Sequence, residues 1–416
     1  MQRTLMIQRS LLRRRLVDIS RHSAGSERIA LDGSLDISFS TSAAPGAANA
    51  ATAAETSAAS AARRPPLVPP DARALAEAQL ENLVDFVESS RGGLLVITGA
   101  GISTEAGLPD YRSPGGAYAT GFKPLTHQQF LASSANRRRY WARAFAGWEG
   151  FSRAEPAAGH VALARLQRRG WVADIVSQNV DRLHTKAGSP RVVELHGSTH
   201  DVVCLACGAV APRAPLQRRM AELNPGAAAR ARARWVGGAE GGGGGGGLGR
   251  PSLYVSAAAA AGREQQHQQQ QQQEQQGQRR PDGDAETGAP PGEAFVVPPC
   301  PSCGASAAAG ADVALKPDVV FFGDGVPKAT SERALRLAEG ASAVLVVGTS
   351  LRVWSAFRLV KAAAEGGTPI AVLTSGPTRA DEQLSAGSVS LRLDALVGEA
   401  LARLERHPRL QVPPVC

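Results

Sequence analysis

Two Cys-x-x-Cys pairs are the strongest chemical signal in this sequence of 416 residues. Cys204 and Cys207 form the first pair, Cys300 and Cys303 form the second, and a glycine follows each pair directly. Together they can supply the four thiolates of a tetrahedral zinc site, whereas a redox dithiol needs only one pair. Four protein ligands leave no open coordination position, so we expect one structural zinc ion per chain.

A glycine-rich turn is the second signal. It comprises Gly99, Ala100, Gly101, Ile102 and Ser103, and it follows a short apolar run that reads as a buried strand. Backbone amides in such a turn can approach a pyrophosphate closely, and a helix that begins there favours negative charge. The turn therefore indicates a nucleotide site.

A dinucleotide-dependent dehydrogenase is the obvious alternative, but two of its features are missing. The third glycine of Gly-x-Gly-x-x-Gly would fall at Thr104. The acidic residue that binds ribose is expected about 20 residues further on, yet no Asp or Glu occurs between Asp110 and Glu149. We infer that the turn binds a nucleotide in a different arrangement.

These residues and several further motifs occur in the order found in sirtuins, and the sequence resembles that family over about 71–225 and 294–405. The motifs are residues 99–103, 107–113, 178–181 and 196–197, the two cysteine pairs, and residues 315–323 and 348–351. Further matches at 140–143, 147–148, 183–189 and 376–379 are similar to the class II mitochondrial branch, of lipoamidase and ADP-ribosyltransferase type.

The resemblance implies NAD-dependent removal of acyl groups from protein lysines, with release of nicotinamide and O-acyl-ADP-ribose. NAD would be the co-substrate, and the acylated protein or peptide would bind as an added strand. We expect neither a nucleic-acid nor a membrane partner. Two alternatives stay open, because nothing in the sequence separates them cleanly: a protein mono-ADP-ribosyltransferase, or a poorly active NAD-binding scaffold.

The resemblance also assigns roles to individual residues. His196 would be the catalytic base, since an imidazole titrates near neutrality, although a lone histidine before glycine is usually a turn residue. Asn179, the second catalytic residue, and Gln178 would hold the nicotinamide ribose, whereas Asp110 and Ile102 would bind the carboxamide. The implied NAD contacts are Gly99, Ala100, Gly101, Ile102, Ser103, Asp110, Tyr111, Arg112, Gln178, Asn179, Asp181, Gly348, Thr349, Ser350, Thr374, Ser375, Gly376 and Val397.

Two of these positions need comment. Asp181 is equally compatible with a direct contact and with a buried residue that orients the loop. Sirtuins usually carry Asn where this chain has Thr374, and a hydroxyl replaces two hydrogen-bonding groups of an amide with one. We therefore expect weaker binding of the adenosine ribose.

Strand-like and helix-like patterns alternate along the chain, and these elements must position the site residues. Buried apolar runs occur at 94–98, 172–176, 319–322, 343–347 and 369–373, and helical stretches include 331–338 and 355–364. Asp71 is a plausible N-cap for a further helix, whose apolar stripe includes Leu75 and Leu80. This alternation predicts an α/β protein with a Rossmann-like doubly wound parallel sheet, accompanied by a smaller helical and zinc-binding module.

The predicted organisation has three parts. Residues 1–70 form a transit peptide and disordered leader, residues 71–405 the catalytic domain, and residues 406–416 a C-terminal tail. Within the catalytic domain we assign 71–200 and 315–405 to a large NAD-binding domain and 201–314 to the zinc module. Residues 226–293, rich in Gly, Gln and Ala, are predicted to be a disordered insert in that module.

The beginning of the chain predicts its destination. Five arginines and no acid occur in the first 16 residues, together with leucine and serine. The composition is typical of an organelle transit peptide, although a solvated basic tail would have a similar one. We expect the mitochondrial matrix, with the chloroplast as the alternative.

Overall fold

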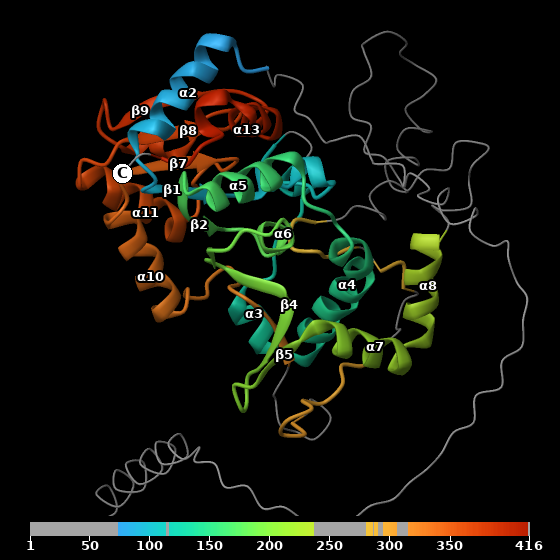
Figure 1. Cartoon of the computed structure of the whole chain (residues 1–416). Coiled ribbons are helices and arrows are strands. Elements are labelled where there is room, and N and C mark those ends of the chain that lie inside the picture. The colour runs from blue at the N-terminus through green and yellow to red at the C-terminus, as the bar shows by residue number, and fades with distance from the viewer. Residues whose placement is uncertain are drawn as a thin grey trace, which may run out of the picture. The chain divides into compact units, whose positions relative to one another are not determined.

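The computed structural model describes residues 74–113, 116–236, 280–285, 287–289, 294–305 and 315–414. Its larger sheet has six parallel strands in the order β3-β2-β1-β7-β8-β9 (Figure 1). The strands are β1 (Leu94–Thr98), β2 (Val172–Ser177), β3 (Val192–Glu194), β7 (Ala343–Val347), β8 (Ile370–Leu373) and β9 (Val389–Leu393). Along the chain this is the doubly wound order 3-2-1-4-5-6, which confirms the predicted fold class.

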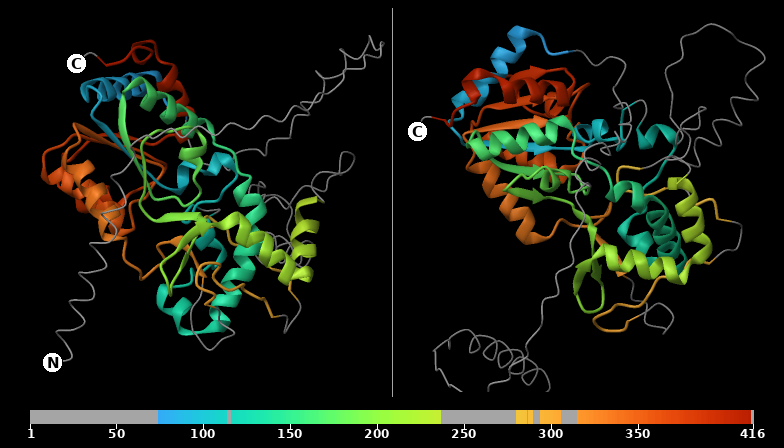
Figure 2. Two further views of the ribbon diagram at one scale, coloured as in Figure 1. Left: turned by 60° about the horizontal axis from the view of Figure 1, so that its bottom comes forward. Right: turned by 45° about the vertical axis from the view of Figure 1, so that its right-hand side comes forward.

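Helices cover both faces of this sheet, because the central strands β1 and β7 are buried at every position. Leu94 and Val96 of β1 pack on one face, whereas Leu95 and Ile97 pack on the other. The first face contacts α2 (Glu77–Ser89), α5 (Ala158–Arg169) and α13 (Val397–Arg406). The second contacts α10 (Lys328–Glu339), α11 (Trp354–Glu365) and α12 (Arg379–Gln383), and Figures 1 and 2 show the main helices on the two sides.

A smaller module is built on an antiparallel sheet in the order β5-β4-β6. Its strands are β4 (Gly197–Cys204), β5 (Val210–Pro212) and β6 (Leu315–Val319), and its helices are α3 (His127–Ala132), α4 (Ser134–Ser152), α7 (Arg213–Leu223) and α8 (Pro225–Val236). The indole of Trp141 donates to the Leu315 carbonyl at 2.7 Å. The Arg213 guanidinium, fully buried, stacks on Trp141 and Trp148. The module therefore has an aromatic core of its own.

Short elements complete the described chain. They are η2 (Ala100–Ile102), η3 (Thr104–Ala106), η4 (Ala117–Thr120), α6 (Leu183–Lys186) and η6 (Pro408–Leu410). Within the described ranges, no helix combines the length and apolarity that a membrane span requires.

Two predictions about the elements were wrong. Residues 319–322 do not form a parallel strand: the strand is Leu315–Val319, and it pairs antiparallel with β4 in the small sheet. An apolar run shows that a segment is buried but not which sheet it joins. Helices α3 and α4 lie inside the predicted range 71–200 of the large domain, yet they pack in the core of the small module.

The predicted insert at 226–293 is too wide at both ends. Residues 226–236 continue helix α8, and Ala228 is buried in the small module. Residues 280–285 are also ordered, with Asp284 only 1% exposed and paired with Arg143. A low-complexity composition does not exclude contacts made by a few residues at its borders. The middle of the insert, 237–279, lies outside the described residues.

The two ends of the predicted domain also differ from expectation. Helix α2 begins at Glu77 with Ala76 as its N-cap, so Leu75 precedes the helix, and Asp71 lies outside the described residues. The leader 1–70 lies outside them as well. Residues 406–414 pack against the domain: Leu410 is fully buried, and the indole of Trp171 donates to the Val412 carbonyl at 2.8 Å.

This packing predicts that Leu410→Ala lowers the free energy of unfolding by about 2–5 kcal/mol, because it leaves a cavity in the core. Urea denaturation followed by circular dichroism measures the change. Val412→Ala is the matched control, since its side chain is 60% exposed and only its backbone is used. Equal free energies of unfolding for Leu410→Ala and Val412→Ala would show that residues 406–414 are a free tail.

Candidate functional site

The site begins where the strand order reverses, between β1 and β7. The turn after β1 touches the turn after β7: the Gly101 amide donates to the Gly348 carbonyl at 2.8 Å. A Cβ added at Gly101 would lie 2.8 Å from that oxygen, and Gly348 has a φ of +58°. Both positions therefore require glycine, and the contact brings two turns of the carboxyl edge together.

A cavity of about 900 Å³ opens at this edge. It is lined by His196 and by every predicted NAD contact except Ile102. Ile102 is 2% exposed and packs in the core beneath the turn. The structure thus brings together residues from turns that are more than 250 positions apart in the sequence.

Two amide side chains are fixed with their oxygens available. The Gln178 amide nitrogen donates to the Thr98 carbonyl and to the Thr349 hydroxyl, at 3.1 and 3.0 Å. The Asn179 amide nitrogen donates to the Gly99 carbonyl and to the Ser103 hydroxyl, both at 3.0 Å. Because the NH₂ groups are used, the amide oxygens stay available as acceptors for sugar hydroxyls.

Asp181 holds the loop around these amides. Its buried carboxylate accepts from the Ser103 hydroxyl at 2.7 Å and from the Leu183 amide at 2.9 Å. Burial raises the pKa of Asp181, although these two hydrogen bonds act in the opposite direction. The contacts show an orienting geometry, although Asp181 also lines the cavity.

Asp110 shapes another loop that lines the cavity. Its Oδ1 accepts from the backbone amides of Arg112 and Ser113, at 3.2 and 2.9 Å. The Arg112 guanidinium lies 5.4 Å from the centre of the Tyr118 ring. Asp110 and Arg112 both line the cavity, so these two predicted NAD contacts lie on one loop.

His196 has one defined tautomer. Its Nδ1 lies 2.9 Å from the Gln178 carbonyl, and because a carbonyl only accepts, Nδ1 carries the proton. Burial lowers the pKa of His196, and the bond to that carbonyl partly opposes the shift. The ring is therefore neutral near pH 7, and Nε2 carries the lone pair of a base.

Glycine follows His196 for a steric reason. Gly197 has a φ of +75°, and a Cβ there would lie 2.0 Å from the Asp318 carbonyl. The glycine lets β4 pair with β6 immediately after the histidine. The His-Gly pair is thus a structural requirement as well as a chemical signal.

Thr374, the position where sirtuins usually have Asn, also lines the cavity. It is 6% exposed, and its backbone amide donates to the Leu393 carbonyl at 3.1 Å. The side chain of Arg392 donates to the Thr374 carbonyl at 3.0 Å. The hydroxyl thus stands where the adenosine ribose is predicted, and weaker ribose binding stays a prediction.

Several lining residues were not predicted as site residues, and three of them, Pro281, Asp282 and Ser355, bear on the chemistry of the site. Pro281 and Asp282 come from the border of the low-complexity insert, and Ser355 comes from the first turn of α11. The Ser355 Oγ lies 2.8 Å from Nε2 of His196. No sequence signal points to Asp282, whereas Ser355 follows closely on the motif at 348–351.

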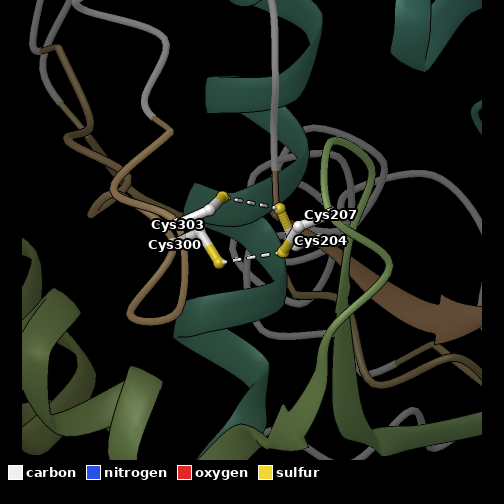
Figure 3. A group of neighbouring side chains, drawn as sticks. All are labelled: Cys204, Cys207, Cys300 and Cys303. Carbon is white, nitrogen blue, oxygen red and sulfur yellow. Dashed lines mark hydrogen bonds between the residues drawn. The ribbon is translucent and has the colours of Figure 1, made fainter. Parts of the chain in front are cut away.

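The four predicted zinc ligands meet in the small module. The four sulfurs lie within 4.8 Å of one another, with Cys204 to Cys303 at 3.8 Å and Cys207 to Cys300 at 3.9 Å (Figure 3). Zn–S bonds of about 2.3 Å in a tetrahedron place sulfurs about 3.8 Å apart, whereas a disulfide needs about 2.05 Å. The cluster fits a zinc ion, and all four cysteines are free of disulfides.

The two cysteine pairs have the same backbone geometry. In each, the glycine amide donates to the carbonyl of the first cysteine, from Gly208 to Cys204 and from Gly304 to Cys300. Both glycines have a φ of +70°, so each turn needs a residue that tolerates the left-handed region. Two matching knuckles face each other and present two thiols apiece.

The fold and the site define a class: a doubly wound nucleotide-binding enzyme with a four-cysteine metal module. The Sir2 family model matches residues 99–355. An NAD-dependent protein deacylase of Arabidopsis thaliana, SRT2, is 40% identical over 359 residues, which cover 84% of each chain. The chain belongs to the Sir2 family, whose members use NAD as co-substrate.

Other comparisons agree. The mitochondrial NAD-dependent protein lipoamidase sirtuin-4 of Bos taurus is 38% identical over 338 residues, covering 81% of this chain and 89% of the relative. A solved structure of a Sir2 enzyme aligns with 79% of this chain and 97% of its own, at 24% identity and a TM-score of 0.53. That likeness supports the fold.

The cysteine cluster predicts one zinc ion per chain and a stabilising role. Removing zinc with a chelator, or changing Cys207→Ser, should lower Tm by more than about 5 °C, because the module loses the ion that joins its two knuckles. Elemental analysis and thermal melting measure both effects. Cys416→Ser, outside the two Cys-x-x-Cys pairs of the sequence, is the control. Folded protein without zinc, with an unchanged Tm, would contradict the site.

Proposed function

We propose that this chain removes acyl groups from protein lysines with NAD, releasing nicotinamide and O-acyl-ADP-ribose. The observation that carries the proposal is that His196 lines a cavity of about 900 Å³ while its Nδ1 is bound to the Gln178 carbonyl, which leaves Nε2 as the basic nitrogen. Asn179 and Gln178 stand in the same cavity with available amide oxygens. The site thus combines a base with acceptors for ribose hydroxyls.

The chemistry explains why these groups are needed. An amide oxygen is a poor nucleophile, so the site must favour departure of nicotinamide from the ribose and stabilise the positive charge that develops there. NAD supplies the sugar carbon that accepts the acyl oxygen. Asn179 and Gln178 hold the sugar, and His196 takes a proton from a ribose hydroxyl at Nε2.

We infer that the acylated peptide adds as a strand at the mouth of the cavity. The segment 320–323 and the segment after Ser350 both line the cavity, and two large side chains there are exposed. Phe322 is 42% and Trp354 is 53% exposed. An extended peptide between two backbone segments is held by main-chain hydrogen bonds, so its sequence is recognised loosely.

Of the two alternatives, mono-ADP-ribosyl transfer uses the same cleavage of NAD with another acceptor. The curated relatives carry deacylase, deacetylase or lipoamidase names, which favours acyl removal for this chain. The scaffold alternative is disfavoured because His196, Asn179 and Asp110 are present and face one cavity.

The test is incubation of the pure protein with NAD and a panel of acyl-lysine peptides. We expect loss of the acyl group with stoichiometric release of nicotinamide, because one NAD is consumed for each acyl group transferred. Chromatography and mass spectrometry measure both products. Label from NAD on protein, without acyl loss, would instead support the transferase, and no release of nicotinamide would support the scaffold.

The matched variant for this assay is His196→Tyr. It should abolish turnover while Tm and zinc content stay at their wild-type values, since the base is lost but the fold is not. Retained acyl removal in this variant would overturn the assigned base.

We propose a mitochondrial matrix address. It is supported by the arginine-rich, acid-free first 16 residues and by the mitochondrial name of the Bos taurus relative. A fluorescent protein fused to residues 1–70 should accumulate in mitochondria. Changing Arg13, Arg14 and Arg15 to Glu should leave it in the cytosol, because the positive charge is removed. Accumulation of the parent fusion in chloroplasts would contradict the proposal.

A further inference from the structure

The lone pair of the proposed base has a partner in the structure, and its role as a base rests on the proposed function. With the proton on Nδ1, the His196 ring has a single acceptor, Nε2. That atom lies 2.8 Å from the Ser355 Oγ. Because Nε2 cannot donate in this tautomer, the serine hydroxyl donates to it. Nε2 of His196 therefore already accepts a hydrogen bond from Ser355 before substrate binds.

Ser355 is placed for this contact by its helix. It is the second residue of α11 (Trp354–Glu365), whose N-cap Val353 makes no side-chain cap. The serine hydroxyl could have capped the helix locally, as serine often does near a helix start. Instead it points to a histidine 159 residues earlier in the sequence. Both residues line the cavity.

We propose that Ser355 is a positioning residue for His196: its hydroxyl holds the imidazole with Nε2 toward the cavity and yields its place to a ribose hydroxyl. When substrate binds, the ribose O–H replaces the serine O–H as the donor to Nε2. The proton that then moves to Nε2 comes from the ribose, and Ser355 keeps its own. No covalent bond of the serine is made or broken; only its hydrogen bond to Nε2 is exchanged.

This arrangement favours the neutral ring before substrate arrives. A donor to Nε2 stabilises the unprotonated nitrogen, so it acts in the same direction as burial, which lowers the pKa of His196. Removing the hydroxyl should therefore make His196 easier to protonate. On the acid side of the pH profile, the fall in kcat/KM should therefore begin at a higher pH.

Other charged groups also lie near His196. The charged or titratable side chains that line the cavity with His196 are Glu105, Asp110, Tyr111, Arg112, Tyr118, Asp181, Asp282, Asp324, Arg352 and Arg358. Those on strands β3, β4 and β6 and on the rest of α11 are Glu194, His200, Asp201, Cys204, Lys316, Asp318, Lys361 and Glu365, and Arg182 pairs with Glu194 and Asp201. Among the described residues, the side-chain partner of the ring is Ser355 alone, and the causes of its pKa shift are burial and the Gln178 carbonyl. Ser355 is thus the side chain whose removal should change the titration.

The first experiment follows the His196 imidazole by NMR in the full-length zinc-loaded protein, without substrate. The signal is identified by its loss in His196→Tyr. We expect His196 to titrate at higher pH in Ser355→Ala than in the wild type. Ser355→Thr, which keeps the hydroxyl, should restore the wild-type titration. Ser89→Ala, at an exposed position of α2, is the control for substitution itself.

The second experiment measures nicotinamide release against pH. For Ser355→Ala we expect the ratio of kcat/KM at pH 6 to that at pH 8 to fall by about threefold, because more of the base is protonated at pH 6. At pH 8 the base is unprotonated in both proteins, so the value at pH 8 is the reference for the ratio. A residue with a merely structural role would lower kcat equally at both values.

The His196 titration tests the role of Ser355 independently of the proposed deacylase activity. An unchanged His196 titration in Ser355→Ala, with Tm at the wild-type value, overturns the proposal about Ser355. Ser355→Thr decides the matter if the alanine variant fails to fold: a titration unlike that of the wild type in folded protein also overturns it. The titration needs no NAD and no turnover, so it remains decisive even if the proposed deacylase activity fails.

Discussion

The contact between the two turns at the strand-order reversal is the constraint on which the site depends. Gly101 and Gly348 meet at 2.8 Å between amide and carbonyl, which only residues without side chains allow. This contact fixes the spacing of the carboxyl edge between β1 and β7. The loops that carry Asp110, Asn179 and Thr349 are arranged around it, so the geometry of the cavity follows from backbone packing.

Buried polar groups then define what the cavity can do. Each amide nitrogen of Gln178 and Asn179 is bound to backbone and hydroxyl groups, which leaves the oxygens for a ligand. Asp181 orients Ser103 beneath them. A buried network of polar groups lowers the stability of the fold unless each group has a hydrogen-bond partner. Here the buried members have partners, and the unused acceptors are those that face the cavity.

The small module contributes to the site through the strand that follows His196. Its strand β4 begins directly after His196, and β6 pairs with it. The cysteine cluster at the other end of β4 joins the two knuckles, so a zinc ion there would hold both strands without touching the cavity. A structural metal can thereby affect the position of His196 through one strand of eight residues.

Much of the site and fold could be predicted from the sequence, because local patterns carry that information. Apolar runs and glycine spacing located β1, β7 and β8 within one residue, and four cysteines at knuckle spacing predicted the cluster. The borders of the insert at α8 and Asp284 could not be predicted, because their order comes from contacts with distant residues. The pairing of β6 is non-local in the same way.

Residue types and order by themselves determined the family resemblance, the nucleotide turn and the identity of the proposed base. Only the tertiary structure decided that Ile102 belongs to the core, that Asp181 orients Ser103, and that Ser355 donates to His196. The physical reason is distance along the chain. A hydrogen bond between residues 159 positions apart leaves no periodicity or spacing in the sequence, and it exists only once the sheet and helix α11 have packed.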